Sequence, residues 1–406
     1  MQLLAKHLLA LAIHAPILCS AQSLKESLDT QNATLSKLNS FLQSQQAFFN
    51  SLSDTKDITV LAPSNEALNL LADDSDMMDK MSADPDLVTA FLEYHVFQGT
   101  YYPSNITNAQ APLLVPTLMN GTSFTNVTGG QRVQVVDDDG QLQFLSGSLN
   151  QATVQNIPNG QQSFNFSGGT IYIIDRVLAI PANITDTLVS ANLTAAAGAL
   201  KKSKLTADLT QASELTMFAP SNHAFDVVGS ALSDMSAADL ADVMGYHVVQ
   251  GKVLYSSLIT NTTEKTTEGK DVHLRVEDGK MFVNGARIVQ TNILVNNGVV
   301  HVIDNLLNPA HADARPDPTA ATQAPAFAGA TTTGGVPFTS GVGTPTSTTE
   351  PFVPATVTSV GGGGGGGDPD APTVVSGGSK RVVNMTKTEV VRVMVLLGGA
   401  ALFLNV

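Results

Sequence analysis

Two tyrosine–histidine pairs, Tyr94-His95 and Tyr246-His247, are the residues whose types could do chemistry and whose surroundings recur along this chain. A histidine can exchange a proton near neutral pH, and such a pair on a surface could also form a contact point. Each histidine, however, falls at i+7 of an apolar i, i+3, i+4, i+7 series that begins at Val88 or Leu240. We therefore predict core histidines whose ring nitrogens bond to backbone. A contact surface is the alternative.

A second recurring residue is the asparagine of two Ala-Pro-Ser-Asn segments, Asn65 and Asn222. The proline ends a strand, and the serine before each asparagine (Ser64 or Ser221) can cap the helix that follows. We predict that the two asparagines brace these loops.

Acidic clusters at Asp73-Asp74-Ser75-Asp76 and Asp137-Asp138-Asp139-Gly140 have the composition of calcium ligands. An EF-hand loop needs a glutamate at its twelfth position, which counted from Asp137 is Ser148. A solvated loop explains the first cluster and a hairpin turn the second. We predict no metal site.

The sequence has no His-Glu-x-x-His, no Gly-x-Ser-x-Gly and no phosphate loop, and Cys19 is its only cysteine. We predict that the protein is not an enzyme and uses no cofactor. A pair of carboxylates for glycoside cleavage remains the open enzymatic alternative. The chain has no tryptophan and few aromatic residues to stack on sugar rings. A sugar-binding surface is therefore the less favoured form of binding.

The tyrosine–histidine pairs and the asparagines belong to a long internal repeat. Three segments recur in the same order, which indicates two copies of one domain. They are ITVLAPSNEA (Ile58–Ala67) and LTMFAPSNHAF (Leu215–Phe225), LEYHVFQGTY (Leu92–Tyr101) and MGYHVVQGKV (Met244–Val253), and GTIYIIDRVL (Gly169–Leu178) and GVVHVIDNLL (Gly298–Leu307).

Each copy mixes helix and strand signals, so the predicted fold class is α+β. Amphipathic helices carry the histidines, and hairpins are expected at 133–144 and 272–283. The apolar, β-branched segments 171–174 and 299–303 should be central strands. The first copy is longer between its histidine and its Ile-Ile-Asp segment, and this Gly-, Asn- and Gln-rich excess predicts a surface loop insertion.

The start of the chain indicates export. Residues 1–21 read as a signal peptide, with Lys6, an apolar run and small residues before Gln22. The chain carries a net charge of −14, which disfavours nucleic acid as a partner. We expect domains at 22–181 and 182–309.

The end of the chain indicates a lipid anchor. Residues 310–378 are rich in Pro, Thr, Ala, Ser and Gly and predict a disordered stalk. Residues 379–406 combine a polar spacer with an apolar tail, the pattern of a removable glycosylphosphatidylinositol (GPI) signal, with Ser376 as the attachment residue. A permanent membrane helix fits less well because Arg392 interrupts the tail.

Sequons for N-glycosylation are frequent in the part expected to remain. They predict a glycosylated surface. Their asparagines are Asn32, Asn105, Asn120, Asn126, Asn165, Asn183, Asn192 and Asn261.

The repeated segments resemble the fasciclin domain. Its recognised signature is a strand entering Ala-Pro-Ser-Asn, a helix ending in Tyr-His-Val, and a final strand ending in Ile-Asp. The resemblance implies two β-wedge domains flanked by helices. It also implies a secreted or surface-anchored protein on the outer face of the plasma membrane or in the cell wall, similar to fungal and plant glycolipid-anchored members.

In some animal members of the family, an aspartate in an Asp-Ile-Leu stretch before the last strand is linked to integrin binding. This chain lacks that aspartate. The matching positions are Asn292-Ile293-Leu294 and Gln155-Asn156-Ile157, and the chain has no Arg-Gly-Asp. Integrin is therefore a doubtful partner.

Together these features predict an adhesion protein for cell–cell or cell–wall contact. Its expected partners are surface proteins or wall and matrix polysaccharides, with a lipid anchor in the membrane. A structural or glycan-binding wall component without a cell partner is the alternative.

Overall fold

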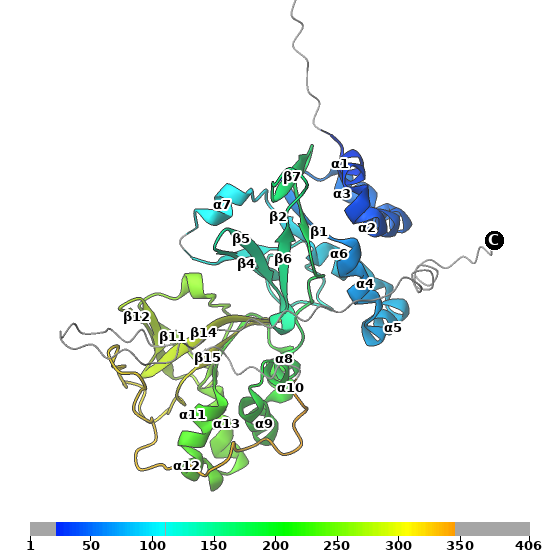
Figure 1. The fold of residues 1–406 in the computed structure, drawn as a ribbon. Coiled ribbons are helices and arrows are strands. Elements are labelled where there is room, and N and C mark those ends of the chain that lie inside the picture. Colours follow the sequence, from blue (N-terminus) through cyan, green and yellow to red (C-terminus); the bar gives the residue numbers. More distant parts are fainter. Residues whose placement is uncertain (1–21, 110, 346–406) are drawn as a thin grey trace, which may run out of the picture.

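A computed structural model describes residues 22–109 and 111–345. These residues form two α+β domains, one above the other in Figure 1. The predicted signal peptide, Ser376 and the predicted GPI signal lie outside the described residues.

The first domain places most of its helices before and beside its sheet. Its elements are α1 (Leu24–Thr30), α2 (Asn32–Ser44), α3 (Gln46–Asp54), β1 (Ile58–Pro63), α4 (Asn65–Ala72), α5 (Ser75–Ala83), α6 (Pro85–Tyr94), β2 (Val96–Gln98), α7 (Pro103–Thr107), β3 (Leu113–Pro116), β4 (Arg132–Asp138), β5 (Gln141–Leu145), the 3₁₀ turn η1 (Gly147–Leu149), β6 (Gln151–Gln155), β7 (Ser163–Phe166) and β8 (Gly169–Ile174).

The second domain repeats this plan with shorter connections. Its elements are α8 (Ile184–Ser190), α9 (Thr194–Ser203), α10 (Thr206–Gln211), β9 (Leu215–Pro220), α11 (Asn222–Val227), α12 (Gly229–Ser233), α13 (Ala237–Gly245), β10 (Val248–Gln250), η2 (Ser256–Leu258), β11 (Thr262–Lys265), β12 (Asp271–Glu277), β13 (Lys280–Val283), β14 (Ala286–Val295) and β15 (Gly298–Ile303).

The two sheets share one topology. In the described residues the strand orders are β2-β1-β8-β6-β5-β4-β3, with β7 also on β8, and β10-β9-β15-β14-β13-β12-β11. The central pairs, β1 with β8 and β9 with β15, are parallel, whereas the other pairs are antiparallel. The repeat seen in the sequence is therefore a repeat of strand order.

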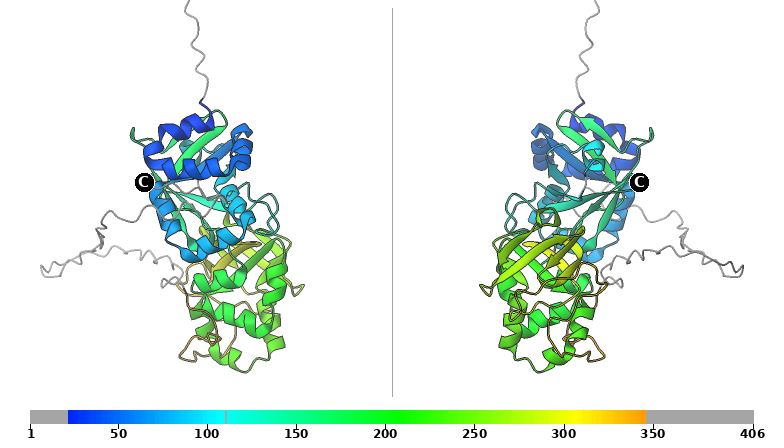
Figure 2. Two further views of the ribbon diagram at one scale, coloured as in Figure 1. Left: turned by 90° about the vertical axis from the view of Figure 1, so that its right-hand side faces the viewer. Right: turned by 90° about the vertical axis from the view of Figure 1, so that its left-hand side faces the viewer.

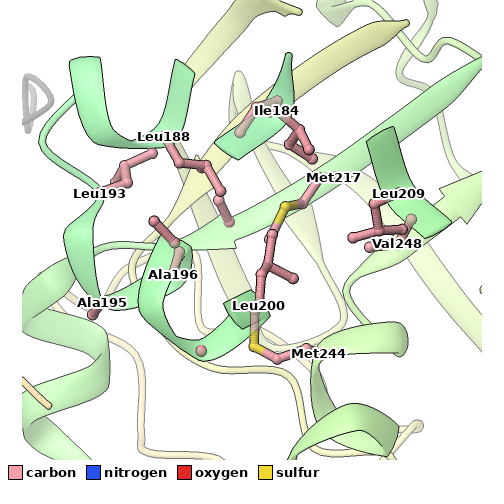
Figure 3. Close-up of a cluster of buried hydrophobic side chains, with 14 of the residues drawn as sticks. Ile184, Leu188, Leu193, Ala195, Ala196, Leu200, Leu209, Met217, Met244 and Val248 are labelled. Carbon is pink, nitrogen blue, oxygen red and sulfur yellow. The ribbon is translucent and has the colours of Figure 1, made fainter. Parts of the chain in front are cut away.

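The central strands are buried on both faces, and side chains alternate between two apolar clusters. In β1, Val60 and Ala62 pack against the helices, whereas Leu61 packs in the cluster on the opposite face. In β9, Met217 and Phe218 divide in the same way. Figure 3 shows the helix-facing cluster of the second domain, where Leu200 of α9 lies near Met217 and Met244. Each domain therefore has its own core.

The two domains contact each other through some of the extra residues that the first domain has and the second lacks. Residues 117–131 connect β3 to β4, where the second domain has only residues 266–270. The Asn126 N–H donates to the Asn296 carbonyl at 2.9 Å, and the buried Gln131 side chain donates to the Val295 carbonyl at 3.0 Å. This part of the predicted surface insertion is thus a domain contact.

Residues 310–345, here called the C-terminal strap, lie along the second domain, where the sequence predicted a stalk from Ala310 onward. Figure 1 shows this segment, coloured yellow to orange, running around the helices of that domain. Phe338 packs edge-on against Phe225, with ring centroids 6.1 Å apart. Ser230 and Thr331 exchange hydrogen bonds of 3.0 and 2.8 Å. Residues 310–345 contain turns and irregular segments but no helix or strand, and the rest of the predicted stalk lies outside the described residues.

Figure 2 shows the same arrangement from two sides, with the strap against the second domain in both views. Among the described helices, none is both long and apolar enough to cross a membrane.

Candidate functional site

The two motif histidines occupy equivalent positions in the two cores. His95 Nδ1 donates to the Phe91 carbonyl at 2.8 Å, and the Leu178 N–H donates to His95 Nε2 at 2.9 Å. His247 repeats this geometry with the Val243 carbonyl at 2.7 Å and the Leu307 N–H at 2.9 Å. A backbone carbonyl can only accept a hydrogen bond and a backbone N–H can only donate one. Both histidine rings are therefore neutral, with the proton on Nδ1.

Each histidine ties the end of a helix to the segment after the last strand of its domain. Burial lowers the pKa of His95 and of His247 from 6.5 to about 4 in each case. The side chains are 4% and 0% exposed. A neutral, enclosed ring with both nitrogens engaged has no atom left for a ligand or a partner.

The tyrosines of the motif are equally enclosed. The hydroxyl of Tyr94 donates to the Arg132 carbonyl at 2.9 Å, and that of Tyr246 to the Asp271 carbonyl at 2.7 Å. Asn284 adds a hydrogen bond to the Tyr246 hydroxyl at 2.9 Å. Both tyrosines therefore join the end of the helix before the histidine to the first residue of β4 or β12, the strand that follows the edge strand.

Asn65 and Asn222 also make internal contacts. The amide of Asn65 donates to the Ala33 carbonyl at 3.1 Å and accepts from the Lys37 N–H at 2.9 Å, which ties α4 to α2. Asn222 donates to the Asn192 carbonyl at 2.7 Å and accepts from the Ala195 N–H at 3.0 Å. Each asparagine joins the strand–helix turn to an earlier helix.

A third buried histidine, His301 in β15, was not singled out from the sequence. Its Nε2 donates to the Leu254 carbonyl at 2.8 Å, and its ring stacks on Phe218 at 5.8 Å. Burial lowers its pKa to about 4. Tyr172 stands at the matching place in β8 and donates to the Tyr101 carbonyl at 2.8 Å. The alignment of the two copies places Tyr172 opposite His301, two ring side chains that can each donate a hydrogen bond. This match was the signal in the sequence that could have identified His301.

The position compared with the integrin-linked acidic residue is internal. Asn292 is 7% exposed, accepts from the Ser256 N–H at 2.8 Å and donates to its hydroxyl at 2.7 Å. Leu294 is buried in a cluster that Leu114 of the first domain joins. This stretch is therefore not displayed as a surface loop.

The acidic clusters act as structural turns and caps. Asp139 and Gly140 both have positive φ, 50° and 83°, at the turn between β4 and β5. Such a pair matches the twist of a two-residue hairpin loop. The Asp74 carboxylate accepts from the Met77 N–H at 3.0 Å and caps α5. Within the described ranges, no three His, Cys, Asp or Glu side chains cluster as metal ligands would.

The sequon asparagines differ in exposure. Those at Asn32, Asn105, Asn120, Asn165 and Asn261 are exposed, whereas those at Asn126, Asn183 and Asn192 are half-buried. Asn183 also caps α8 by accepting from the Asp186 N–H at 3.0 Å. The exposed sequons are spread over both domains.

Comparison with known proteins decides the family. The model of the fasciclin domain matches residues 33–181 and 191–309. This chain belongs to the fasciclin family. The two matches contain both tyrosine–histidine pairs and both Ala-Pro-Ser-Asn turns, so the resemblance inferred from the repeated segments is confirmed.

Fungal relatives match most of the length of this chain. A fasciclin-like arabinogalactan protein of Arthroderma benhamiae is 36% identical over 328 residues, which are 80% of this chain and 76% of the relative. Another from Phaeosphaeria nodorum is 29% identical and covers 72% of this chain and 90% of its own length. Human periostin is 26% identical over 63% of this chain but only 28% of its own length.

Proposed function

We propose that this fasciclin protein is a cell-surface adhesion protein, mediating contact between cells or between a cell and its wall through its tandem domains. The observation that carries the proposal is that two fasciclin domains occur in one chain that is 36% identical to a fungal fasciclin-like arabinogalactan protein. The family and its named relatives support a surface or wall-associated role. Adhesion itself is the proposed step.

The geometry of the motif supports a binding role on the outer surface rather than a reaction in the interior. His95, His247 and their tyrosines use their polar atoms inside the fold. Contacts with a partner would therefore be made by exposed residues and by glycans on the exposed sequons. Two weak contact surfaces on one chain, and many chains on one cell, raise avidity without a tight single site.

The proposed tether is a GPI anchor at Ser376 that follows an exported, glycosylated ectodomain. The small residues at 376–378, the polar spacer and the apolar tail support it. Phosphatidylinositol-specific phospholipase C should then release the protein from intact cells. Retention on the cells after treatment, with Val390–Val406 still present by mass spectrometry, would refute the anchor.

The alternative is a structural or glycan-binding wall component without a cell partner, which the names of the two fungal relatives also suit. Display of the full chain on cells that do not adhere separates the two. Adhesion predicts aggregation of the displaying cells. Retention on isolated wall polysaccharide without aggregation would favour the wall component instead.

A further inference from the structure

A cavity of about 430 Å³ lies between the two domains. It falls in the size range of small-molecule sites. Here called the junction cavity, it is lined by Leu113, Leu114 and Arg132 of the first domain and by Glu214, Tyr255 and Leu258 of the second. Neither domain forms this cavity alone. None of these residues belongs to the tyrosine–histidine motif.

Arg132 supplies an underused cation to the cavity. Its side chain makes one long hydrogen bond, from Nη1 to the Leu114 carbonyl at 3.4 Å, and its buried Nε has no partner. Among the ion pairs of residues 22–109 and 111–345, none involves Arg132. A guanidinium carries five donors in a planar fork that matches a carboxylate. The Arg132 guanidinium therefore has donors to spare for a ligand in the cavity.

Tyr255 holds this guanidinium in place. Its ring centroid lies 5.9 Å from Arg132 Cζ, within the range of a cation–π contact. Its hydroxyl is buried, with the Arg132 side chain beside it. Burial raises the pKa of Tyr255, so the hydroxyl keeps its proton and remains a donor. Arg132 opposes this rise through its positive charge and its side-chain N–H donors, so Arg132 and Tyr255 form one polar pair in the cavity wall.

The Glu214 carboxylate disfavours a ligand whose only polar group is an anion. Its Oε1 accepts from the Thr128 N–H at 2.6 Å, which fixes the carboxylate beside the cavity. Glu214 itself has positive φ, 54°, an uncommon backbone state for a glutamate. The negative charge of Glu214 repels a simple anion, but its carboxylate accepts hydrogen bonds from hydroxyl groups. A fitting ligand carries a carboxylate and hydroxyls together.

The remaining wall is apolar and open to solvent on one side. Leu258 is 57% exposed, one of the few large apolar side chains so exposed among the described residues. Leu113 and Leu114 are half-buried beside it. Such a wall suits the apolar C–H face of a sugar ring, and Tyr255 supplies an aromatic side chain to the same cavity. The volume of the cavity, its charged side chains and its apolar wall thus all fit a small ligand that carries a carboxylate, hydroxyls and an apolar face.

We propose that the junction cavity binds a sugar acid, with its carboxylate on Arg132, its hydroxyls on Glu214 and its ring against the leucines. The acid is either a free uronic acid or the terminal uronic acid of a glycan. The proposal does not depend on cell adhesion. A ligand that bridges both domains would also hold them together.

Isothermal titration of the full chain tests the proposal, after enzymatic removal of N-glycans because the Asn126 sequon borders the cavity. The probes are glucuronic acid, an oligosaccharide ending in glucuronic acid, glucose, hexanoate and inorganic phosphate. The first two should bind more tightly than the last three. Tighter binding of the oligosaccharide identifies a glycan end, and equal binding identifies the free acid.

Two variants locate the site. Arg132→Gln should weaken binding of both sugar acids by about tenfold or more, as expected for loss of a charge-assisted hydrogen bond. Glu214→Gln should narrow the preference for glucuronic acid over hexanoate because the repelling charge is removed. Arg275→Gln is the matched control, since Arg275 also makes one 3.4 Å bond to a backbone carbonyl but lies outside the cavity. It should leave binding unchanged.

Several results would overturn the proposal. They are absence of sugar-acid binding by the wild type at millimolar concentration, equal binding of hexanoate or phosphate, and unchanged affinity in Arg132→Gln. A melting temperature for each variant accompanies the titration. If Arg132→Gln does not fold, Glu214→Gln decides alone, and an unchanged preference in that variant contradicts the assigned role of Glu214.

Discussion

At the scale of single residues, the recurrent polar side chains of this family member are structural. His95 and His247 each accept one backbone N–H and donate to one backbone carbonyl. A histidine suits this task because one ring can be donor and acceptor at the same time. The prediction from the sequence used only the apolar stripe, which shows that a ring is buried. It could not show that the partner would be the segment after the last strand.

Replacing His247 with alanine should lower the stability of the second domain. The Leu307 N–H and the Val243 carbonyl would lose their partner, and a buried unpaired group costs about 1–3 kcal/mol. Thermal unfolding should show a melting temperature lower by several degrees. His273→Ala is the control, because the His273 side chain hydrogen-bonds only to the Thr263 hydroxyl, at 2.9 Å, and its backbone bonds are kept. Unchanged stability together with lost adhesion would move the motif to the surface.

Buried titratable groups should also make stability depend on pH. The pKa of His247 and of His301 falls from 6.5 to about 4, so the unfolded state binds more protons between these values. The free energy of unfolding therefore decreases as the pH is lowered from 6.5 to about 4, by up to about 1.4 kcal/mol per pH unit for each histidine. Burial raises the pKa of Asp304 from 3.8 to about 6. Here the folded state binds the extra proton, which offsets one histidine between pH 6 and 4.

Asp304→Asn removes this offset and keeps an oxygen that can accept from the Arg287 N–H. The second domain should then lose stability more steeply between pH 6 and 4, by about 1.4 kcal/mol more per unit. Urea unfolding at several pH values measures the slope. Asp271→Asn, which removes an exposed ion pair with Lys265, serves as the control. An unchanged slope in Asp304→Asn would show that Asp304 does not titrate as argued.

At the scale of elements, the repeat and the strand–turn–helix units were predictable, whereas segments held by backbone contacts were not. The Ala-Pro-Ser-Asn turns announce a strand end and a helix cap by residue type. The strap contains no such pattern. Lys201 donates to the Gly341 carbonyl at 2.9 Å and Asn305 to the Ala324 carbonyl at 2.6 Å. Backbone acceptors leave no pattern of residue types in the sequence. The composition of the strap therefore predicts only a linker.

Gly198→Ala should loosen the strap while α9 remains folded. A Cβ at this position would lie 1.8 Å from the Phe338 carbonyl oxygen, so the strap must shift. Alanine favours a helix interior over glycine by up to about 1 kcal/mol, so α9 itself should not suffer. Hydrogen exchange at strap amides such as that of Thr331 should become faster. Gly335→Ala adds a Cβ in open space and should change nothing. Unaltered exchange in Gly198→Ala would contradict the packing described.

At the scale of the whole molecule, the two domains form one unit through residues that neither copy's pattern reveals. Residues 117–131, Asn296 and Glu214 are far apart in the sequence and meet at the junction. A sequence repeat identifies what the copies share, but an interface between them depends on what they do not share. The junction cavity is unpredictable from the sequence for the same reason.

Gln131→Ala should weaken this junction. The Val295 carbonyl would lose its hydrogen bond in a buried place, at a cost of about 1–3 kcal/mol. Hydrogen exchange at the Asn126 and Glu214 amides, which cross the junction, should become faster. Gln141→Ala loses a comparable bond to the Val154 carbonyl inside the first domain and is the control. Equal exchange in both variants would argue against a junction held in this way.

The central claim is that the tandem domains themselves make the adhesive contact. Soluble protein comprising residues 22–345 can be added to cells that display the full chain and aggregate. We predict that it prevents aggregation in a dose-dependent manner, whether the partner is a second copy or another molecule, because it occupies the same contact surfaces. Aggregation that persists unchanged at saturating soluble protein would show that the contact lies outside residues 22–345, and would contradict the account.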